Sequence, residues 1–455
     1  MENKLGTMPI GRLIVTMSVP MMISMFVQAL YNMVDSMFVA NISENALTAV
    51  TLAFPVQNVM HAIAVGTGVG VSALVSRSLG QRNGAAAQKA ANVQIFLSAC
   101  YWIFFLVVGI LFTKMFFRMQ TDIEEVIAYG EEYLSIVCIF SVGMFYGQNL
   151  EKLLVAVGFS GKSMISQASG AVINIILDPI LIFGWWIFPE MGVRGAAIAT
   201  VIGQSFAALL AFYFNLRINH QTRFDVKQML PQRRVVSEIF SVAFPSMVTI
   251  GLPSVTGYIM NGILLSFSAT ATAVFGVWIK IQSFAFMPVF GMNNGTIPIY
   301  SYNYGARRYD RVRETLKKAL MLGLSVTSAA MLLYEIIPGP LLYLFDASDY
   351  MLEIGIWAIR ICSISLPIGA VCILVSTSVQ LIDYSRYTLV INISRQLVLP
   401  VLVGWLLAMS GRLTYVWFFP LISECIAALI AVGLCLRVFR KFRREEAEEA
   451  ARGKA

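Results

Sequence analysis

Charged and titratable residues are scarce in this sequence. Of its 455 residues only 13% are charged, two are histidines and six are cysteines, whereas 58% are hydrophobic and the mean hydropathy is +0.74. This composition excludes an ordinary soluble globular protein and predicts a chain that crosses a membrane several times. The cysteines all lie in apolar runs without metal-binding spacing, which indicates small hydrophobic side chains rather than disulfides or metal ligands.

Signatures of soluble enzymes and of nucleotide binding are also missing. The sequence has no G-xxxx-G-K-[ST] loop and no domain large enough to hold a nucleotide, so we expect neither an enzyme nor an organic cofactor. Residues 1–12 are short and mixed in character, and no cleaved signal peptide is expected. Uphill transport by such a protein would draw its energy from an ion gradient.

Long apolar runs dominate instead. Twelve segments have the length of a membrane span: residues 12–40, 46–76, 90–113, 132–157, 163–188, 195–216, 235–266, 271–301, 319–342, 354–380, 387–409 and 414–437. They predict an all-α membrane protein with two six-helix, pseudo-symmetric lobes around a central cavity. The predicted parts are an N-terminal lobe (1–216), an inter-lobe linker (217–234), a C-terminal lobe (235–437) and a charged cytoplasmic tail (438–455).

Lysine and arginine are concentrated on one side of the predicted topology. With both termini in the cytoplasm, 25 of the 33 Lys and Arg residues lie on that side, four on the other and four within spans. Cytoplasmic loops carry such an excess, so we predict a multi-pass protein of a bacterial-type cytoplasmic (inner) membrane. The net charge of +8 therefore orients the chain among membrane lipids, and no nucleic-acid binding is expected.

The two halves of the sequence repeat at a constant offset. Pro20 aligns with Pro245, and at the same offset a G-xxx-G pair beginning at Gly66 aligns with one beginning at Gly291. Halves with an even number of spans enter the membrane in the same direction, so their pseudo-symmetry axis should run along the membrane normal. Two such lobes with a cavity between them are typical of a carrier that works by alternating access, and one chain would suffice as a functional monomer.

An acid lies within the first span. Asp35 shares one helix face with Gln28 and Asn32, and Tyr31 lies one turn before it. A carboxylate at mid-membrane costs roughly 2.5–3.5 kcal/mol on insertion scales, so such residues usually face a protein interior or a water-filled cavity. The stripe predicts a site for an ion, a proton or a solute; the alternative is an interhelical hydrogen-bond cluster.

A second acid lies in the fifth span. Asp178 follows Asn174 by one turn and precedes Pro179, which biases its backbone away from regular helix. Carboxylate, amide and free carbonyl oxygens are ligands that Na⁺ accepts at broken helices, whereas the same carboxylates could instead bind protons. The constant offset pairs the two acids with Met260 and Val403, so we predict that the coupling site lies in the N-terminal lobe.

Other polar residues within the spans are candidates for a substrate cavity or a gate. They are Gln57, His61, Lys280 and Arg395, beside the first-span residues Gln28, Tyr31 and Asn32. For His61 the alternative is a hydrogen-bonded packing histidine, and for Arg395 it is a structural ion pair with Glu424. Glu151 and Lys152, near the cytoplasmic end of the fourth span, could pair with each other or extend to the interface.

The sequence resembles the multidrug and toxic compound extrusion (MATE) family over nearly its whole length. The matching motifs are LYNMVDSMFVA (30–40), ALTAVTLAFPV (46–56), GTGVGVSALVSRSLGQRN (66–83), NIILDP (174–179), GVRGAAIATVIGQ (192–204) and GMNNGTIPIYSYNYGARR (291–308). The resemblance implies export of drugs and other organic, mostly cationic, compounds by antiport with Na⁺ or H⁺. It also implies a cation site of Asp35, Asn174 and Asp178, which would be the metal ligands if the ion is sodium, with Thr200 as a fourth member.

One departure from the family pattern concerns the seventh span. Many relatives, especially in the NorM-like branch, carry an acid there, whereas this chain has none between Pro245 and Ser266. The departure favours a DinF-like or related bacterial branch and weighs against coupling in the C-terminal lobe. An alternative function is a flippase for a lipid-linked oligosaccharide or peptidoglycan precursor, to whose cationic cavity only Lys280, Arg360 and Arg395 could contribute. A channel or a membrane receptor is a less favoured alternative.

Overall fold

The computed structural model describes residues 4–185, 187–345, 347–382 and 384–452, with the backbone alone for residues 443–452. Within this described part the chain forms helices and no strand, so the all-helical prediction is confirmed. Residues 1–3, 186, 346, 383 and 453–455, which belong to the predicted lobes and tail, lie outside the described residues. The rest of the predicted charged tail continues the last helix as far as Arg452.

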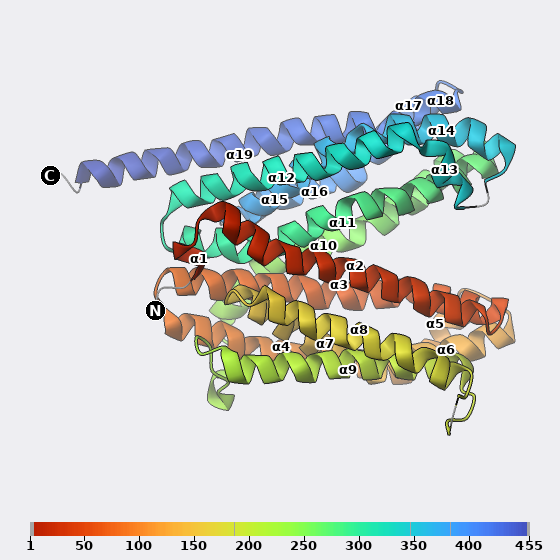
Figure 1. Ribbon diagram of the computed structural model, residues 1–455, viewed down its shortest axis with the longest axis horizontal. Helices are drawn as coiled ribbons and strands as arrows, with labels where there is room; N and C mark the ends of the chain where they lie inside the picture. The colour runs from red at the N-terminus through yellow and green to blue at the C-terminus, as the bar shows by residue number, and fades with distance from the viewer. Residues whose placement is uncertain (1–3, 186, 346, 383, 453–455) are drawn as a thin grey trace. The chain divides into compact units, whose positions relative to one another are not determined.

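The described residues contain ten helices that are long and apolar enough to cross a membrane, and two bent helix pairs bring the number to twelve. The first half supplies α2 (Ile10–Ala40), α3 (Glu44–Gly80), α4 (Gly84–Leu111), the bent pair α6 (Glu124–Ile139) and α7 (Val142–Ala156), α8 (Ser160–Ile182) and α9 (Gly192–Ile218) (Figure 1). The bend between α6 and α7 measures 47°.

The second half follows the same order (Figure 1). It consists of α10 (Arg233–Leu265), α11 (Ala269–Gly305), α12 (Tyr309–Ile336), the bent pair α14 (Asp349–Ser363) and α15 (Ser365–Leu381), a composite span of α16 (Ser385–Ile393), η2 (Ser394–Val398) and α17 (Leu399–Ala408), and α19 (Phe419–Arg452). Short helices complete the set: α1 (Lys4–Thr7), α5 (Thr113–Arg118), η1 (Val226–Gln228), α13 (Pro338–Tyr343) and α18 (Leu413–Val416).

The helices group into two compact units. Unit 1 comprises Met1–Met8 and Val15–Met247, and unit 2 comprises Pro9–Ile14 and Val248–Ala455. The predicted linker, residues 217–234, contains η1 and the first residues of α10. Helix α10 runs unbroken from Arg233 to Leu265 and is shared by both units. Its residues up to Met247 belong to unit 1, and those from Val248 onward belong to unit 2. The lobe boundaries expected from the sequence stay predictions.

The repeat seen in the sequence is also present in the backbone. Helices α3 and α11 both contain 37 residues, α4 and α12 both contain 28, and the first residues of each pair are related by the constant offset of the sequence repeat. Ser43 and Ser268 cap α3 and α11 in the same way, because each hydroxyl accepts a 3.0 Å hydrogen bond from the backbone N–H three residues later. Equivalent sequence positions therefore begin equivalent helices.

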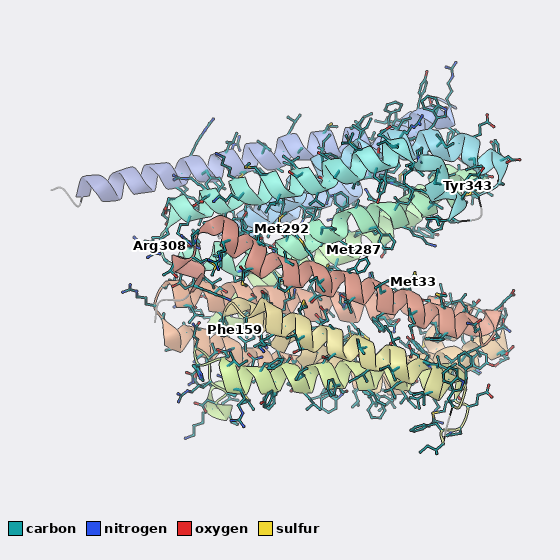
Figure 2. The ribbon with its side chains drawn as sticks, in the orientation of Figure 1. Met33, Phe159, Met287, Met292, Arg308 and Tyr343 are labelled. Atoms are coloured by element: carbon teal, nitrogen blue, oxygen red, sulfur yellow. The ribbon has the colours of Figure 1, made fainter. Side chains whose placement is uncertain are left out.

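The ends of α3 and α11 are equivalent as well. Arg82 and Arg307 have φ angles of 58° and 56°, and they are the non-glycine residues with positive φ in the described chain. The next amide bonds back to a carbonyl five residues earlier, at 2.9 Å from Asn83 to Ser78 and at 2.8 Å from Arg308 in unit 2. Figure 2 shows Arg308 at the turn between α11 and α12.

One residue is inserted into the second half. Helix α8 contains 23 residues, whereas its counterpart Ser385–Ala408 contains 24. The additional residue lies in the π-helix η2, where the Leu399 N–H bonds to the carbonyl of Ser394. After η2 the offset between the halves is therefore larger by this one position. The counterpart of Asp178 is Gly404, so the predicted pairing with Val403 is wrong by one position.

Candidate functional site

Unit 1 contains a cavity of about 540 Å³ that is lined by polar and apolar side chains. Its walls include the predicted residues Gln28, Tyr31, Asn32, Asp35, Gln57, His61, Asn174 and Thr200. Sites for drug-sized ligands commonly measure roughly 300–1,000 Å³. Helices α2, α3, α8 and α9 thus bring most first-half candidates together around one cavity. Asp178 is not a lining residue, but it is hydrogen-bonded to Asn174, which is one.

Asp178, Asn174 and Thr200 form a hydrogen-bonded group between α8 and α9. They are 0%, 2% and 4% exposed, respectively. Both ends of the Asn174 amide are satisfied when its nitrogen donates to Asp178 Oδ2 (3.1 Å) and its oxygen accepts from the Thr200 backbone N–H (3.0 Å). The amide therefore holds one oxygen of the Asp178 carboxylate in a defined position.

Two glycines allow α8 and α9 to approach this closely. A Cβ atom added at either Gly170 or Gly203 would lie 2.6 Å from the carbonyl oxygen of the other glycine. Asn174 follows Gly170 by one turn, and its Cβ lies 3.0 Å from the position of a Cβ added at Gly203. Small residues at this crossing thus bring the Asn174 and Thr200 backbones into hydrogen-bonding range.

Asp35 faces the cavity from α2. It is 8% exposed, and its Oδ1 atom is buried without a hydrogen-bond partner among the described residues. Its charge interacts with that of Asp178. A buried carboxylate oxygen without a donor is costly, so the group is suited to take up a proton or a cation. A second acid nearby strengthens this tendency, because like charges oppose each other's ionisation.

Two tyrosines complete the surroundings of Asp35. The Tyr31 hydroxyl is hydrogen-bonded to the side chain of Thr200, and Gln57 Nε2 donates to the Tyr133 hydroxyl (3.1 Å). The Tyr133 hydroxyl also interacts electrostatically with Asp35 and Asp178. Nothing in the sequence marked Tyr133, because it lies in α6 without an acid or amide at helical spacing that would define a polar face.

Further polar residues of the lining were not among the candidates predicted from the sequence. They are Gln148, Gln167 and Gln204. On α8, Gln167 lies two turns before Asn174. On α9, Gln204 lies one turn after Thr200, and on α7, Gln148 lies one turn before Glu151, so a shared helix face could have indicated all three. Glu151, expected to pair with Lys152 or to extend to the interface, is 6% exposed and lines the cavity, and it interacts electrostatically with Lys152.

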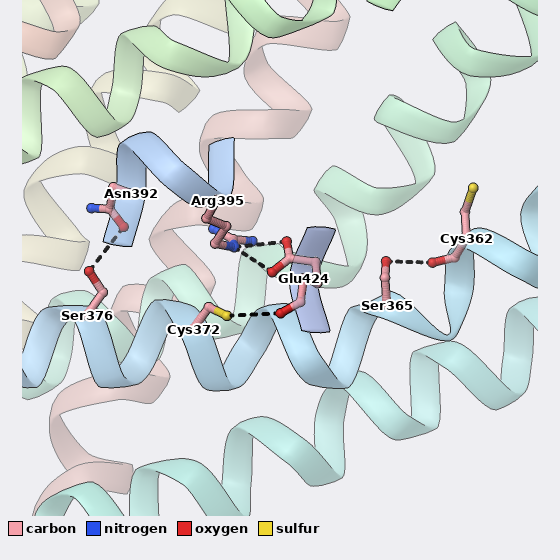
Figure 3. A network of polar contacts seen from close by, with 7 residues as sticks. All are labelled: Cys362, Ser365, Cys372, Ser376, Asn392, Arg395 and Glu424. Atoms are coloured by element: carbon pink, nitrogen blue, oxygen red, sulfur yellow. Dashed lines mark hydrogen bonds and ion pairs between the residues drawn. The ribbon is translucent and has the colours of Figure 1, made fainter. Parts of the chain in front are cut away.

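The remaining candidates belong to unit 2. Lys280 is exposed, and its ammonium lies 5.4 Å from the ring centre of Phe345. Arg395 Nε contacts both carboxylate oxygens of Glu424, at 2.9 and 2.8 Å, and both side chains are almost fully buried (Figure 3). The structural ion pair considered for Arg395 is therefore present. A gating role for Lys280 or Arg395 stays a prediction.

The cavity offers oxygen ligands to a coupling ion. Among the described residues, no group of three or more His, Cys, Asp and Glu side chains could hold a metal ion. A sodium ion would therefore need the carboxylates of Asp35 and Asp178 together with the amide of Asn174 and the hydroxyl of Thr200. This donor set fits Na⁺, and the two carboxylates alone fit H⁺.

Comparison with known protein families gives a match in both halves. A family model described as MatE matches residues 20–180 and 245–406. The first positions of the two matched stretches are related by the constant offset of the repeat, whereas their last positions are separated by one position more. This difference in length agrees with the insertion at η2.

Curated relatives and solved structures extend this match. The chain is 25% identical over 417 residues to "Multidrug export protein MepA" of Staphylococcus haemolyticus, covering 91% of each chain. It is 23% identical over 425 residues to the protein of that name in Staphylococcus aureus (strain MRSA252), covering 93% of each. A solved outward-facing conformation of a multidrug resistance MATE family transporter of the MOP superfamily superposes with a TM-score of 0.90 at 24% identity, covering 97% of this chain and 98% of that one. A MOP superfamily transporter from Pyrococcus furiosus gives a TM-score of 0.88 at 24% identity with the same coverage. These structures show the fold alone.

Proposed function

Because the chain belongs to the MatE family, we propose that it exports organic, mostly cationic, compounds from the cytoplasm by antiport with H⁺ or Na⁺. The observation that carries this proposal is the cavity of unit 1, with the acid Asp35 in its wall and Asp178 next to it. The MepA relatives are named as multidrug export proteins. The protein is in this proposal a transporter in a bacterial-type cytoplasmic membrane, with both termini in the cytoplasm, and not an enzyme.

The coupling ion is a transported cargo. A proton or sodium ion that enters the cluster gives Asp35 Oδ1 the partner that the described protein does not provide. Its charge also relieves the repulsion between Asp35 and Asp178. Since the cluster joins α2, α8 and α9, ion binding favours one arrangement of these helices over another. Linkage then requires that the ion and the organic substrate change each other's affinity by the same factor.

Transport of a lipid-linked oligosaccharide or peptidoglycan precursor draws less support. Such a substrate carries a pyrophosphate and needs unneutralised positive charge. Arg395 is paired with Glu424, and Arg360 lies 4.0 Å from Glu335. A functional monomer that exports organic compounds among membrane lipids remains the better-supported proposal.

Purified protein in liposomes, loaded with a fluorescent cationic dye, tests the proposal. A sodium gradient and a pH gradient are imposed in separate runs, and we expect one of them to drive dye movement. Asp178→Asn, which removes the charge and keeps the shape, is expected to abolish that movement. Dye movement under neither gradient contradicts the proposal, and lipid-linked precursors would then be the next substrates to test.

A further inference from the structure

The cavity of unit 1 contains another acid, which the proposed ion coupling does not use. Glu151, on α7, is buried, yet it lines the cavity. Its neighbour Lys152 is not among the lining residues. A Cβ added at Gly68 would lie 2.7 Å from Lys152 Cγ, so the lysine stem passes along α3 at that glycine. The two adjacent side chains thus take different directions, with the carboxylate in the cavity wall and the lysine stem packed on α3.

Glu151 lies far from the ion cluster along the helix axes. Asn215 Nδ2 donates to the carbonyl of Leu150 (3.0 Å), which places the end of α7 beside the late part of α9. Thr200, which belongs to the ion cluster, lies on the same helix α9. At about 1.5 Å per residue, Thr200 and Asn215 are separated by on the order of 20 Å. The cavity therefore has an acid near each end.

Uncharged side chains make up most of the remaining wall. They combine amides with apolar and aromatic groups, among them Gln148, Gln167, Gln204, Phe54, Met60 and Met144. Amides accept or donate hydrogen bonds without a charge preference, and methionine and aromatic side chains adapt to varied apolar shapes. Such a wall suits the body of an amphiphilic organic molecule whose charge is bound elsewhere.

The charged side chains in the cavity lining are acids, which favours a positive ligand. Among the described lining residues none is Lys or Arg, and the acids are Asp35 and Glu151. Lys152 acts electrostatically on Glu151 and on His61 from outside the lining. A buried carboxylate in a wall of uncharged groups gains most from a ligand that brings a positive charge into the cavity itself.

We propose that Glu151 binds the cationic group of the transported compound, at a position separate from the Asp35–Asp178 ion cluster. This inference rests on the proposed function and narrows its substrate class to amphiphiles with one delocalised or quaternary positive charge and an apolar body. The ion and the substrate then share helices rather than ligands. They influence each other through the positions of α7, α8 and α9, and neither displaces the other directly.

Equilibrium binding of ethidium, a fluorescent monocation, to the purified full-length protein tests this proposal. Glu151→Gln removes the charge and keeps the shape, and we expect its ethidium Kd to rise by about tenfold or more, as for the loss of a charge-assisted contact. Binding of the neutral dye Nile red is expected to stay unchanged. Glu132→Gln makes the same exchange at an exposed position on α6 and serves as the matched control.

A second variant separates charge from structure. Glu151→Asp keeps the carboxylate, so we expect it to bind ethidium more tightly than Glu151→Gln. Equal ethidium binding by wild type and Glu151→Gln overturns the proposal. Equal losses in the Asp and Gln variants, or parallel loss of both dyes, also overturn it, because they indicate a structural role.

These experiments distinguish a failure of the Glu151 inference from a failure of the antiport proposal. Wild-type protein that needs Glu151 to bind ethidium, but moves it under neither gradient, supports this inference and refutes antiport. Gradient-driven ethidium movement that is normal in Glu151→Gln refutes this inference and leaves antiport standing.

Discussion

Units 1 and 2 have the same helical order but carry different chemistry at equivalent places. Where unit 1 has Asp35 and Asp178, unit 2 has Met260 and Gly404. A Cβ added at Gly404 would lie 2.8 Å from Met260 Cε, so the methionine fills the space against the glycine. The repeat thus sets where two helices meet, and the side chains decide whether the meeting point holds buried acids or a packed core.

A further difference lies on the fifth span of each repeat. At the position of Gly170, which brings α8 against α9, unit 2 has Arg395 in the widened turn of η2. Pro400 leaves the carbonyl of Gln396 without its helical N–H, and the hydroxyl of Thr256 donates to that carbonyl instead. In unit 2 the Arg395 side chain is paired with Glu424 and the Gln396 carbonyl with Thr256, whereas in unit 1 Gly170 and Asn174 line a cavity.

Removing the carboxylate of Asp35 is expected to have the largest effect of the changes that test this comparison. We expect Asp35→Asn to reduce gradient-driven export in liposomes to the level of protein-free vesicles, because the neutral amide neither gains a proton nor offers a charge to Na⁺. Met260→Leu, at the equivalent position of unit 2, changes volume little and should cost less than about 1.5 kcal/mol. Export should therefore persist in that variant. Normal export by Asp35→Asn would place coupling elsewhere.

Breaking the ion pair of unit 2 should have a large effect on stability. Arg395→Met leaves Glu424 buried without a partner, and loss of one member of such a pair costs about 3–5 kcal/mol. Unfolding of the purified protein in detergent measures this change. The double variant Arg395→Met/Glu424→Leu removes both charges and is expected to recover most of the loss. A double variant as unstable as the single one would show that the ion pair is not the cause.

The glycine crossing of unit 1 is the next most sensitive place. In Gly203→Ala the added methyl would lie 2.6 Å from the Gly170 carbonyl oxygen and 3.0 Å from Asn174 Cβ. Overpacking of this kind costs about 1–3 kcal/mol, and the separation of α8 from α9 should also weaken coupling. Gly433→Ala in unit 2 meets no atom within 4 Å and is expected to be neutral or slightly stabilising. Similar losses in both variants would argue against the steric explanation.

Much of the fold was predictable because a helix that crosses a membrane must be long and apolar, and this requirement is visible in the sequence. Apolar runs of spanning length predicted the helices, and the bent pairs appeared in the sequence as single spans. Asp35 and Asp178 were recognisable because an acid in an apolar span is costly unless it faces a cavity. The insertion at η2 was not, since one additional residue leaves the apolar pattern of the span unchanged. It shifted the counterpart of Asp178 from Val403 to Gly404.

The cavity wall was predictable only in part. Gln28, Asn32 and Asp35 share a helix face, so each supported the others. Tyr133 is placed at the cavity by the packing of α6, which no local spacing reports, whereas Gln148 lies one turn before Glu151, which also lines the cavity. A residue such as Tyr133, which has no acid or amide one turn away, is therefore the kind that only the tertiary structure reveals.

The smallest expected effect tests where the two repeats are most alike. Arg82 and Arg307 hold left-handed backbone, which costs a non-glycine residue about 1–2 kcal/mol, whereas glycine adds about 0.5–1 kcal/mol of unfolded-state entropy. We therefore expect Arg82→Gly to stabilise the protein by about 0.5–1 kcal/mol in detergent unfolding. Arg307 takes part in a further interaction, so Arg307→Gly should gain less. Gln81→Gly, at a φ of −74°, has no strain to relieve and should destabilise; stabilisation there would mean that glycine acts through something other than the backbone angle.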